Sequence, residues 1–462
     1  ADRSTRWPRY ALLLALIGAG PLAAAEPGWV EFAGKVAAGP QSLALSDCAG
    51  PVKAAGVVVE HSDFKVVPAG TRSKAGCAPA ADYMTGRLPS ADFKLDGIKS
   101  GQTYIAAPPD LRKFIAEDAK AAGVPYRVGV VVATPGVAFA KGLPQTGTLT
   151  ALPDGRMLWR TALLSPGALW VDFEFAKLKL PAGAELFITT PKGDVVRGPI
   201  RAADIQASGS FYSAYVPGDT AIIEVAMTPQ ALAATHVEVA SLTHAYRNLF
   251  DTDVGAKSGS CNVDTICSLG DGWRNEIDAV GRYTLRINGS TALCTGTLIA
   301  NTRRDTTPYF LTANHCISSE TVADTVVVYW NYQSATCRTP GSAASGSPLS
   351  ISLSTHNQSG SLMVATNAAT DFTLLRLDSS VPTAANPFWS GWDVRGQAPP
   401  SAVTIHHPNG DEKRISDTIL PLTTSSYLGA TGSGITHWRV ADWNNGTTEG
   451  GSSGSGLWSP SK

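Results

Sequence analysis

The sequence predicts an all-β protein built from more than one domain. Between residues 127 and 242, apolar side chains stand at alternate positions, as at Leu169, Val171, Phe173 and Phe175, which is typical of strands. The turn sequences "SPG", "LPAG" and "TPKGD" separate these runs. Later runs such as "TVVVYWNY" and "DFTLLRL" are short and β-rich. A chain of 462 residues with 44% apolar residues is too long for one compact domain.

Residues 1–25 have the layout of a secretory signal peptide. Three arginines precede an apolar run over residues 11–19, and the small residues at 23–25 predict a cut after Ala25. The apolar run is shorter than the roughly 20 residues that a membrane span needs. We therefore expect a secreted protein, with a membrane anchor as the lesser alternative.

Residues 26–109 are expected to form an N-terminal leader segment. They are rich in Gly, Ala and Pro and have weak periodicity. Cys48 and Cys77 lie within this segment, and we expect a disulfide between them because export permits disulfides.

Residues 110–257 are interpreted as a pro-region with one helix and a β-sandwich. Asp110 precedes apolar residues at helical spacing that end at Gly123, which predicts a capped packing helix. The alternating runs that follow predict the sandwich. No cluster of His, Ser and carboxylate stands out in these residues, so we expect an accessory domain here.

The stretch "NLFDTDVGAKSGSCNVD" is the expected domain boundary, because exposed polar backbone of this kind is where proteases cut. A second all-β domain, 258–462, begins there. In this domain Ser453 lies in "GGSSGSG", His315 follows an apolar run in "YFLTANHC", and Asp371 starts "DFTLLRL". A serine, a histidine and an aspartate are the side chains that acyl transfer needs, and the order His, Asp, Ser is one of the known triad orders.

Charge and cysteine usage narrow the classes of function. The chain has 37 Lys and Arg against 38 Asp and Glu, a net charge of -1, and no block of like charge, so nucleic-acid and membrane-surface binding are not expected. The seven cysteines show no CxxC spacing, which favours disulfides over zinc. His406 and His407 are adjacent and would point to opposite faces of a strand. We expect no metal and no cofactor.

Several sequences of the second domain resemble those of trypsin-like serine proteases. "CTGTLI" followed by "LTANHC" matches the motifs around the paired cysteines and the histidine of these enzymes. "SGSCNVDTIC", "FWSGWD", "IHHPNGDEKRIS" and "TEGGSSGS" are similar to the bacterial lysyl endopeptidase family over about residues 258–455. The resemblance implies a chymotrypsin-like double β-barrel after a pro-domain.

The resemblance also implies roles for particular residues. Ser453 would be the nucleophile, His315 the general base and Asp371 its orienting partner. The N–H groups of Gly451 and Ser453 would form the oxyanion hole. The implied disulfides are Cys294–Cys316 and Cys267–Cys337. The implied substrates are polypeptides cut after lysine, so we expect the precursor to be cut after Lys257, which leaves Ser258 as the mature N-terminus.

Two further implications concern the end of the domain and its activation. The family's partner for Cys261 and the acidic base of its specificity pocket would lie beyond Lys462, so we expect a chain truncated after the catalytic serine with an incomplete second barrel. Ser452 stands where trypsin has the aspartate that receives the new N-terminal ammonium, and Gly456 stands where proline is usual. Activation is therefore expected from removal of the pro-region, which acts in cis on an enzyme expected to be monomeric.

Two alternatives stay open from the sequence. One is a trypsin-like protease of other specificity, for instance one that cuts after glutamate or small residues. The other is a secreted binding protein or adhesin whose protease-like domain is degenerate, against which the intact set of His315, Asp371 and Ser453 argues.

Overall fold

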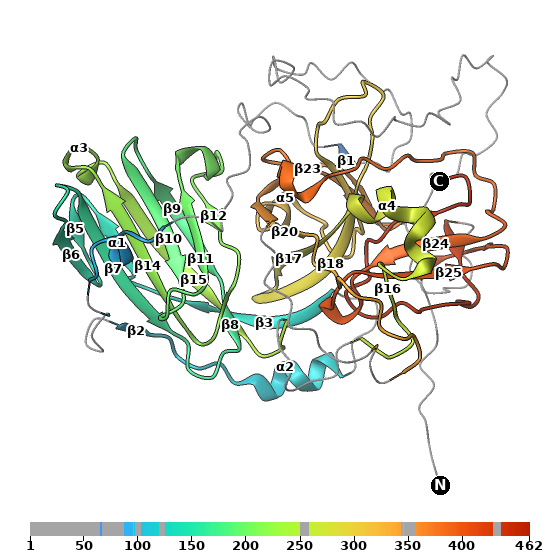
Figure 1. The fold of residues 1–462 in the computed structure, drawn as a ribbon, viewed down its shortest axis with the longest axis horizontal. Helices are drawn as coiled ribbons and strands as arrows, with labels where there is room; N and C mark the ends of the chain where they lie inside the picture. The colour runs from blue at the N-terminus through green and yellow to red at the C-terminus, as the bar shows by residue number, and fades with distance from the viewer. Residues whose placement is uncertain are drawn as a thin grey trace, which may run out of the picture.

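A computed structural model describes residues 65–66, 87–95, 97, 103–119, 125–249, 258–342, 345, 356–427 and 436–462. The predicted signal peptide, Cys48, Cys77 and Lys257 lie outside the described residues. Strands dominate the described part, which confirms the all-β prediction (Figure 1). None of its helices combines the length and the apolar character that crossing a membrane would require.

Two facing sheets form the predicted sandwich. The first has the order β11-β10-β14-β7-β2, with β6 on β7; its strands are β2 (Thr103–Ile105), β6 (Thr148–Ala151), β7 (Met157–Leu164), β10 (Ala184–Thr189), β11 (Val196–Ile200) and β14 (Thr220–Met227). The second contains β3 (Tyr126–Ala133), β4 (Ala138–Ala140), β5 (Leu143–Pro144), β9 (Phe173–Lys179), β12 (Phe211–Tyr212) and β15 (His236–Ala245). Trp159, Phe173 and Val225 belong to the apolar core that both sheets share.

Short elements border the sandwich. They are β8 (Trp170–Val171) paired with β13 (Val216–Pro217), the helices α1 (Pro89–Asp92) and α3 (Pro229–Leu232), and the 3-10 turn η3 (Ala202–Asp204).

The predicted helix after Asp110 is α2 (Leu111–Asp118), and the Asp110 side chain caps it by accepting a hydrogen bond from the Arg112 N–H. The helix ends before the predicted limit, with Ala119 as its C-cap. None of its residues is buried, so it is not a core helix. It is held instead at its C-terminal end, where Asp118 and Glu117 form ion pairs with Arg127.

The first half of the second domain contains β17 (Val280–Ile287), β18 (Ser290–Leu298), β19 (Tyr309–Thr312), β20 (Val327–Trp330), β21 (His356–Ser359), β22 (Ser361–Asn367) and β23 (Phe372–Leu377), with helix α5 (Glu320–Ala323). Pairing runs β21-β20-β17-β18-β19-β23-β22. β21 continues into β22 through Gly360, so the run of strands curves back toward its start. Strand β1 (Lys65–Val66) pairs with β22.

The second half is an open sheet of order β16-β25-β24-β28 with a separate pair β26-β27. These strands are β16 (Val263–Asp264), β24 (Ala402–His406), β25 (Arg414–Thr418), β26 (Thr423–Ser425), β27 (His437–Arg439) and β28 (Leu457–Trp458). Its helical turns are α4 (Arg274–Ala279), η4 (Ser268–Trp273), η5 (Thr383–Ala385) and η6 (Pro408–Gly410). The implied double barrel is thus present as two strand groups, of which the second is open in the described part of the chain.

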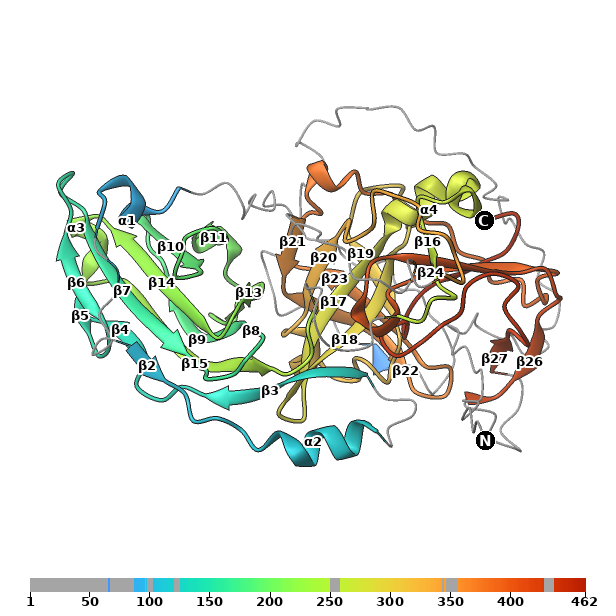
Figure 2. The same cartoon turned by 60° about the horizontal axis from the view of Figure 1, so that its bottom comes forward.

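Strand β3 joins the two domains into one hydrogen-bonded sheet. One side of β3 pairs with β15 of the sandwich and its other side pairs with β18, with Tyr126 opposite Leu293 and Val130 opposite Ser290. Figures 1 and 2 show β3 running from the sandwich to the second domain, beside α2. The pairing covers the N-terminal half of β18, which would otherwise be an edge.

Buried polar groups line the contact between the domains. Arg286 on β17 donates to Asp172 at 2.6 Å and to Glu174 at 3.2 Å. Arg282 is fully buried and donates to the Tyr215 hydroxyl of the sandwich at 2.6 Å. The polar face of the alternating run therefore faces the second domain rather than water.

Candidate active site

His315 lies in the turn that follows β19. Its neighbour Cys316 is bonded to Cys294 on β18, and both cysteines are fully buried. The side chain of His315 is 11% exposed. The disulfide ties the turn to the adjacent strand, so the imidazole is carried on a rigid part of the core. This implied disulfide is confirmed, as is Cys267–Cys337.

Asp371 directly precedes β23 and binds His315 twice. Its Oδ2 lies 2.7 Å from Nδ1 of the imidazole, and its Oδ1 accepts the backbone N–H of His315 at 2.8 Å. The carbonyl oxygen of Asp371 accepts from the N–H of Asn314 at 3.1 Å. Asp371 is 3% exposed and has a positive φ of 50°, a conformation that aspartate tolerates better than most residues. The carboxylate is therefore fixed in position by backbone as well as by side-chain contacts.

Ser453 lies in a tight turn against β18 and β19. Thr295 donates its N–H to the Ser453 carbonyl and its hydroxyl to the Gly451 carbonyl, both at 2.8 Å. Gly451 and Gly454 have φ of 87° and 85°, and a Cβ on Gly454 would collide with the Thr312 hydroxyl and the Thr295 carbonyl. Only glycine can adopt this backbone at such close approach.

The turn leaves two amides and one imidazole nitrogen available. The N–H groups of Gly451 and Ser453 donate no hydrogen bond to any group that the structure describes. His315 Nε2 is buried and has no hydrogen-bond partner among the same residues, Ser453 included. A Cβ on Gly454 would come within 3.0 Å of the Ala313 N atom, so the serine turn and the histidine turn are in contact. The structure thus places the turn that carries Ser453 against the turn that carries His315, which is paired with Asp371.

Tyr427 borders His315, and His437 borders Tyr427; neither residue was predicted. The Tyr427 ring lies 6.3 Å from the imidazole of His315 and 5.7 Å from the ring of His437. Burial, together with the nearby charge of Asp371, raises the pKa of Tyr427 to about 12. Burial lowers the pKa of His437. No local pattern marks either residue, since they come together only through β26 and β27.

The first residues of the second domain are attached to the serine turn. The Glu449 carboxylate accepts from the Gly259 N–H at 2.8 Å and from the Asn262 side chain at 3.0 Å. Burial raises the pKa of Glu449, against the effect of these hydrogen bonds. Ser258 is buried and donates its hydroxyl to Asp411 at 2.6 Å. The segment that follows the expected cut therefore lies beside the turn.

The sandwich also reaches the turn. A Cβ on Gly450 would come within 2.8 Å of the Tyr126 ring at the start of β3. The Arg247 guanidinium lies over the same Tyr126 ring, 4.5 Å from its centroid. One strand thus connects the sandwich, β18 and the serine turn.

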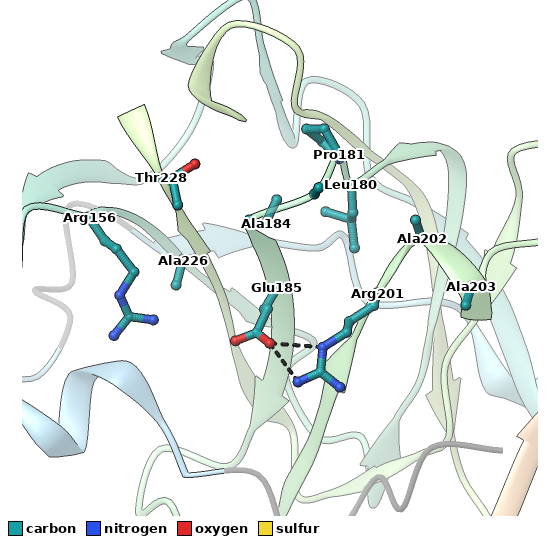
Figure 3. A pocket seen from close by; sticks show the side chains of 12 residues that line it. Arg156, Leu180, Pro181, Ala184, Glu185, Arg201, Ala202, Ala203, Ala226 and Thr228 are labelled. Carbon is teal, nitrogen blue, oxygen red and sulfur yellow. Dashed lines mark hydrogen bonds and ion pairs between the residues drawn. The ribbon is translucent and has the colours of Figure 1, made fainter. Parts of the chain in front are cut away.

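Cys261 and a hollow in the sandwich are not part of this site. Cys261 is exposed and forms no disulfide with another described residue. A hollow of about 360 Å³ lies in the sandwich, bordered by the ion pair Glu185–Arg201 at 2.6 Å (Figure 3). Its lining is mostly apolar, with Leu180 and Pro181 among the residues, and it includes no histidine that could activate the Thr228 hydroxyl.

Comparison with known proteins matches the second domain to one family. Residues 255–462 match the family model for the lysyl endopeptidase C-terminal domain. A lysyl endopeptidase of Pseudomonas aeruginosa is 28% identical over 388 residues, which cover 78% of this chain and 77% of that protein. The second domain is therefore similar to the C-terminal domain of lysyl endopeptidases. The matched residues include Ser258, His315, Asp371 and Ser453.

Parts of solved protease structures are also similar to this chain. A serine endoprotease from Yersinia pestis has 17% identity and a TM-score of 0.26, and the match covers 42% of this chain and 54% of that one. The protease Anisep from Arthrobacter nicotinovorans has 15% identity and a TM-score of 0.24, with 42% and 84% covered.

Proposed function

We propose that the chain is a serine endopeptidase that hydrolyses peptide bonds through an acyl-enzyme on Ser453. The observation that carries the proposal is the His315–Asp371 pair, bound at two points, beside a serine turn with two available amides. These are a base, an orienting carboxylate, a nucleophile and oxyanion donors. The similarity to the C-terminal domain of lysyl endopeptidases supports the same reaction class.

The reaction follows from the roles of these groups. Ser453 Oγ attacks the carbonyl carbon of the substrate while His315 Nε2 takes the hydroxyl proton. Asp371 holds the proton on Nδ1 and stabilises the imidazolium. The N–H groups of Gly451 and Ser453 bind the oxyanion. His315 then gives its proton to the leaving amine, and a water molecule, activated in the same way, releases the acyl group from Ser453 as a carboxylic acid.

We also propose that the enzyme cuts polypeptides after lysine. The named relative is a lysyl endopeptidase, and the same preference would allow cleavage of the precursor after Lys257. The disulfides favour an extracellular enzyme, exported by the signal at residues 1–25, with the pro-region as a partner in cis and the mature enzyme as a monomer.

Replacement of the nucleophile tests the function. Ser453→Ala in the full-length protein should abolish both peptide hydrolysis and labelling by a fluorophosphonate probe. Ser461→Ala is the matched control, because Ser461 is an exposed serine in the same stretch. Hydrolysis by the Ser453→Ala protein at the wild-type rate would refute the proposal. N-terminal sequencing of the mature protein tests the processing step, and a start remote from Ser258 would argue against it.

A further inference from the structure

We propose that His406 is a positioning residue that holds the oxyanion-binding turn in place through the hydroxyl of Ser452. The inference rests on the proposed function and adds to it a residue outside the catalytic set. His406 ends strand β24, and its two ring nitrogens form hydrogen bonds with Ser452 and Ser416 rather than with the catalytic residues. A series of hydrogen bonds with a defined direction connects it to the turn.

A carbonyl group at one end of this series of hydrogen bonds determines which atom donates at each step. The Ser416 hydroxyl donates to the carbonyl of Thr447 at 2.9 Å, because a carbonyl can only accept. Ser416 Oγ lies 3.1 Å from His406 Nε2 and, with its proton already used, must accept there, so Nε2 carries the proton. His406 Nδ1 is then an acceptor, and the Ser452 hydroxyl donates a hydrogen bond to it at 2.8 Å. Ser452 Oγ in turn accepts the N–H of Glu449 at 3.1 Å.

The series of hydrogen bonds reaches Ser452, the residue between the two oxyanion donors. Ser452 separates Gly451 from Ser453. Its N–H donates to the Glu449 carbonyl and its carbonyl accepts from the Ser455 N–H, both at 3.1 Å. With its hydroxyl bound to His406 as well, Ser452 is held on three sides. Rotation of Ser452 would turn the amides on either side of it away from the oxyanion.

The surroundings of His406 suit an uncharged acceptor. The ring is fully buried. Burial, with the nearby Arg414 cation, lowers the pKa of His406 to about 3. The groups that face the ring are Ser416 from β25, Ser452 from the turn and Arg414, while the adjacent His407 bonds to the Asp411 carbonyl instead. His406 therefore stays neutral at ordinary pH, and Nδ1 keeps its lone pair for Ser452.

The arrangement gives the substitution at position 452 a physical meaning. In trypsin-like enzymes an aspartate at this position binds an ammonium group. Here a serine binds a neutral imidazole, so no ion pair is needed at this position to hold the turn. The uncut chain already has the turn in place, with Gly451 at φ 87°.

Two substitutions of His406 distinguish the role of Nδ1 from that of Nε2. In His406→Asn the short amide oxygen can replace Nδ1 and accept from Ser452. In His406→Gln the longer amide reaches the Nε2 position and leaves Ser452 without its acceptor. We expect His406→Gln and Ser452→Ala to lower kcat by about 10- to 100-fold with little change in KM, since a misplaced oxyanion donor affects the transition state. His406→Asn should stay within about threefold of the wild type.

The affinity of a peptide aldehyde, whose hemiacetal adduct uses the same amides, provides a second measurement. It should fall in parallel with kcat in His406→Gln and Ser452→Ala. The double variant should have a kcat no lower than that of the less active single variant, because both changes break the same series of hydrogen bonds. NMR of isotope-labelled histidine should show His406 protonated at Nε2 in the wild type, whether or not the enzyme is active.

Two results would overturn the inference. One is wild-type kcat in both His406→Gln and Ser452→Ala. The other is an equal loss in the Asn and Gln variants, matched by an equal fall in Tm, which would mean that His406 only fills space. Failure of the proposed function is distinguishable, because it would appear as hydrolysis that persists in Ser453→Ala.

Discussion

Asp371→Asn should trap His315 in the wrong tautomer, and the structure explains why. Asp371 Oδ1 accepts the backbone N–H of His315 at 2.8 Å, and this donor cannot change its role. The oxygen of an asparagine amide must therefore take the Oδ1 position, since an NH₂ group there would face another donor. The NH₂ group then points at Nδ1, which lies 2.7 Å from Oδ2 in the native protein. Nδ1 must accept, so the proton moves to Nε2, where it blocks proton transfer from Ser453.

The expected loss is about 10⁴-fold in kcat, the effect of the corresponding change in a well-studied serine protease triad. That factor equals about 5.4 kcal/mol of transition-state stabilisation. The assay is steady-state hydrolysis of a chromogenic peptide with lysine before the scissile bond, combined with a thermal melt. Tm should change little because the amide has the shape of the carboxylate. Asp154→Asn in the sandwich, where Asp154 binds the neighbouring Arg156, is the matched control. A loss below about tenfold would refute the tautomer argument.

Three further outcomes are expected. Replacing both Cys294 and Cys316 by alanine should lower the free energy of unfolding by about 3 kcal/mol, because the bond closes a loop of 22 residues; an unchanged urea midpoint would contradict this. The free energy of unfolding should fall as the pH drops from 6.5 toward 3, and His406 should contribute up to about 1.4 kcal/mol per pH unit. The reason is that the pKa of His406 is about 3 in the folded protein, so the unfolded chain binds the proton first. In urea titrations, His406→Asn should reduce this dependence of the free energy of unfolding on pH. Arg286→Ala should lower the urea midpoint by leaving the buried Asp172 carboxylate without its cation, whereas Arg201→Ala, at a more exposed pair, should not.

The candidate site was predictable from sequence because its residues lie in short local patterns. His315 directly precedes a disulfide cysteine, Asp371 directly precedes a strand, and Ser453 lies among glycines with positive φ on either side. Each of these features is set by a few neighbouring residues. The two disulfides of the second domain were implied by the family resemblance, and the structure contains both.

The residues around the site were not predictable in the same way. Tyr427 and Tyr126 reach His315 and the serine turn from other segments of the chain, and Glu449 of that turn binds Gly259, 190 residues away. Their contacts depend on how sheets pack, and single-residue patterns carry no information about that. The histidine pair was considered only as a metal site, and its hydrogen bonds to Ser452 and to the Asp411 carbonyl became visible only in three dimensions.

The alternation in the sandwich shows where the sequence reasoning was incomplete. Period-two patterns identify an apolar face and leave the other face to be assigned to water by default. Along β8 and β9 the other face carries Asp172, which lies between the two strands, and Glu174. Both carboxylates bind Arg286 of the second domain. A buried carboxylate opposite a guanidinium favours one docking geometry, because an ion left without its partner there would be destabilising. Together with the β3–β18 ladder, these contacts are non-covalent, so a cut before Ser258 breaks the chain without removing any of them. Separation of the domains must therefore disrupt both the ladder and the ion pairs.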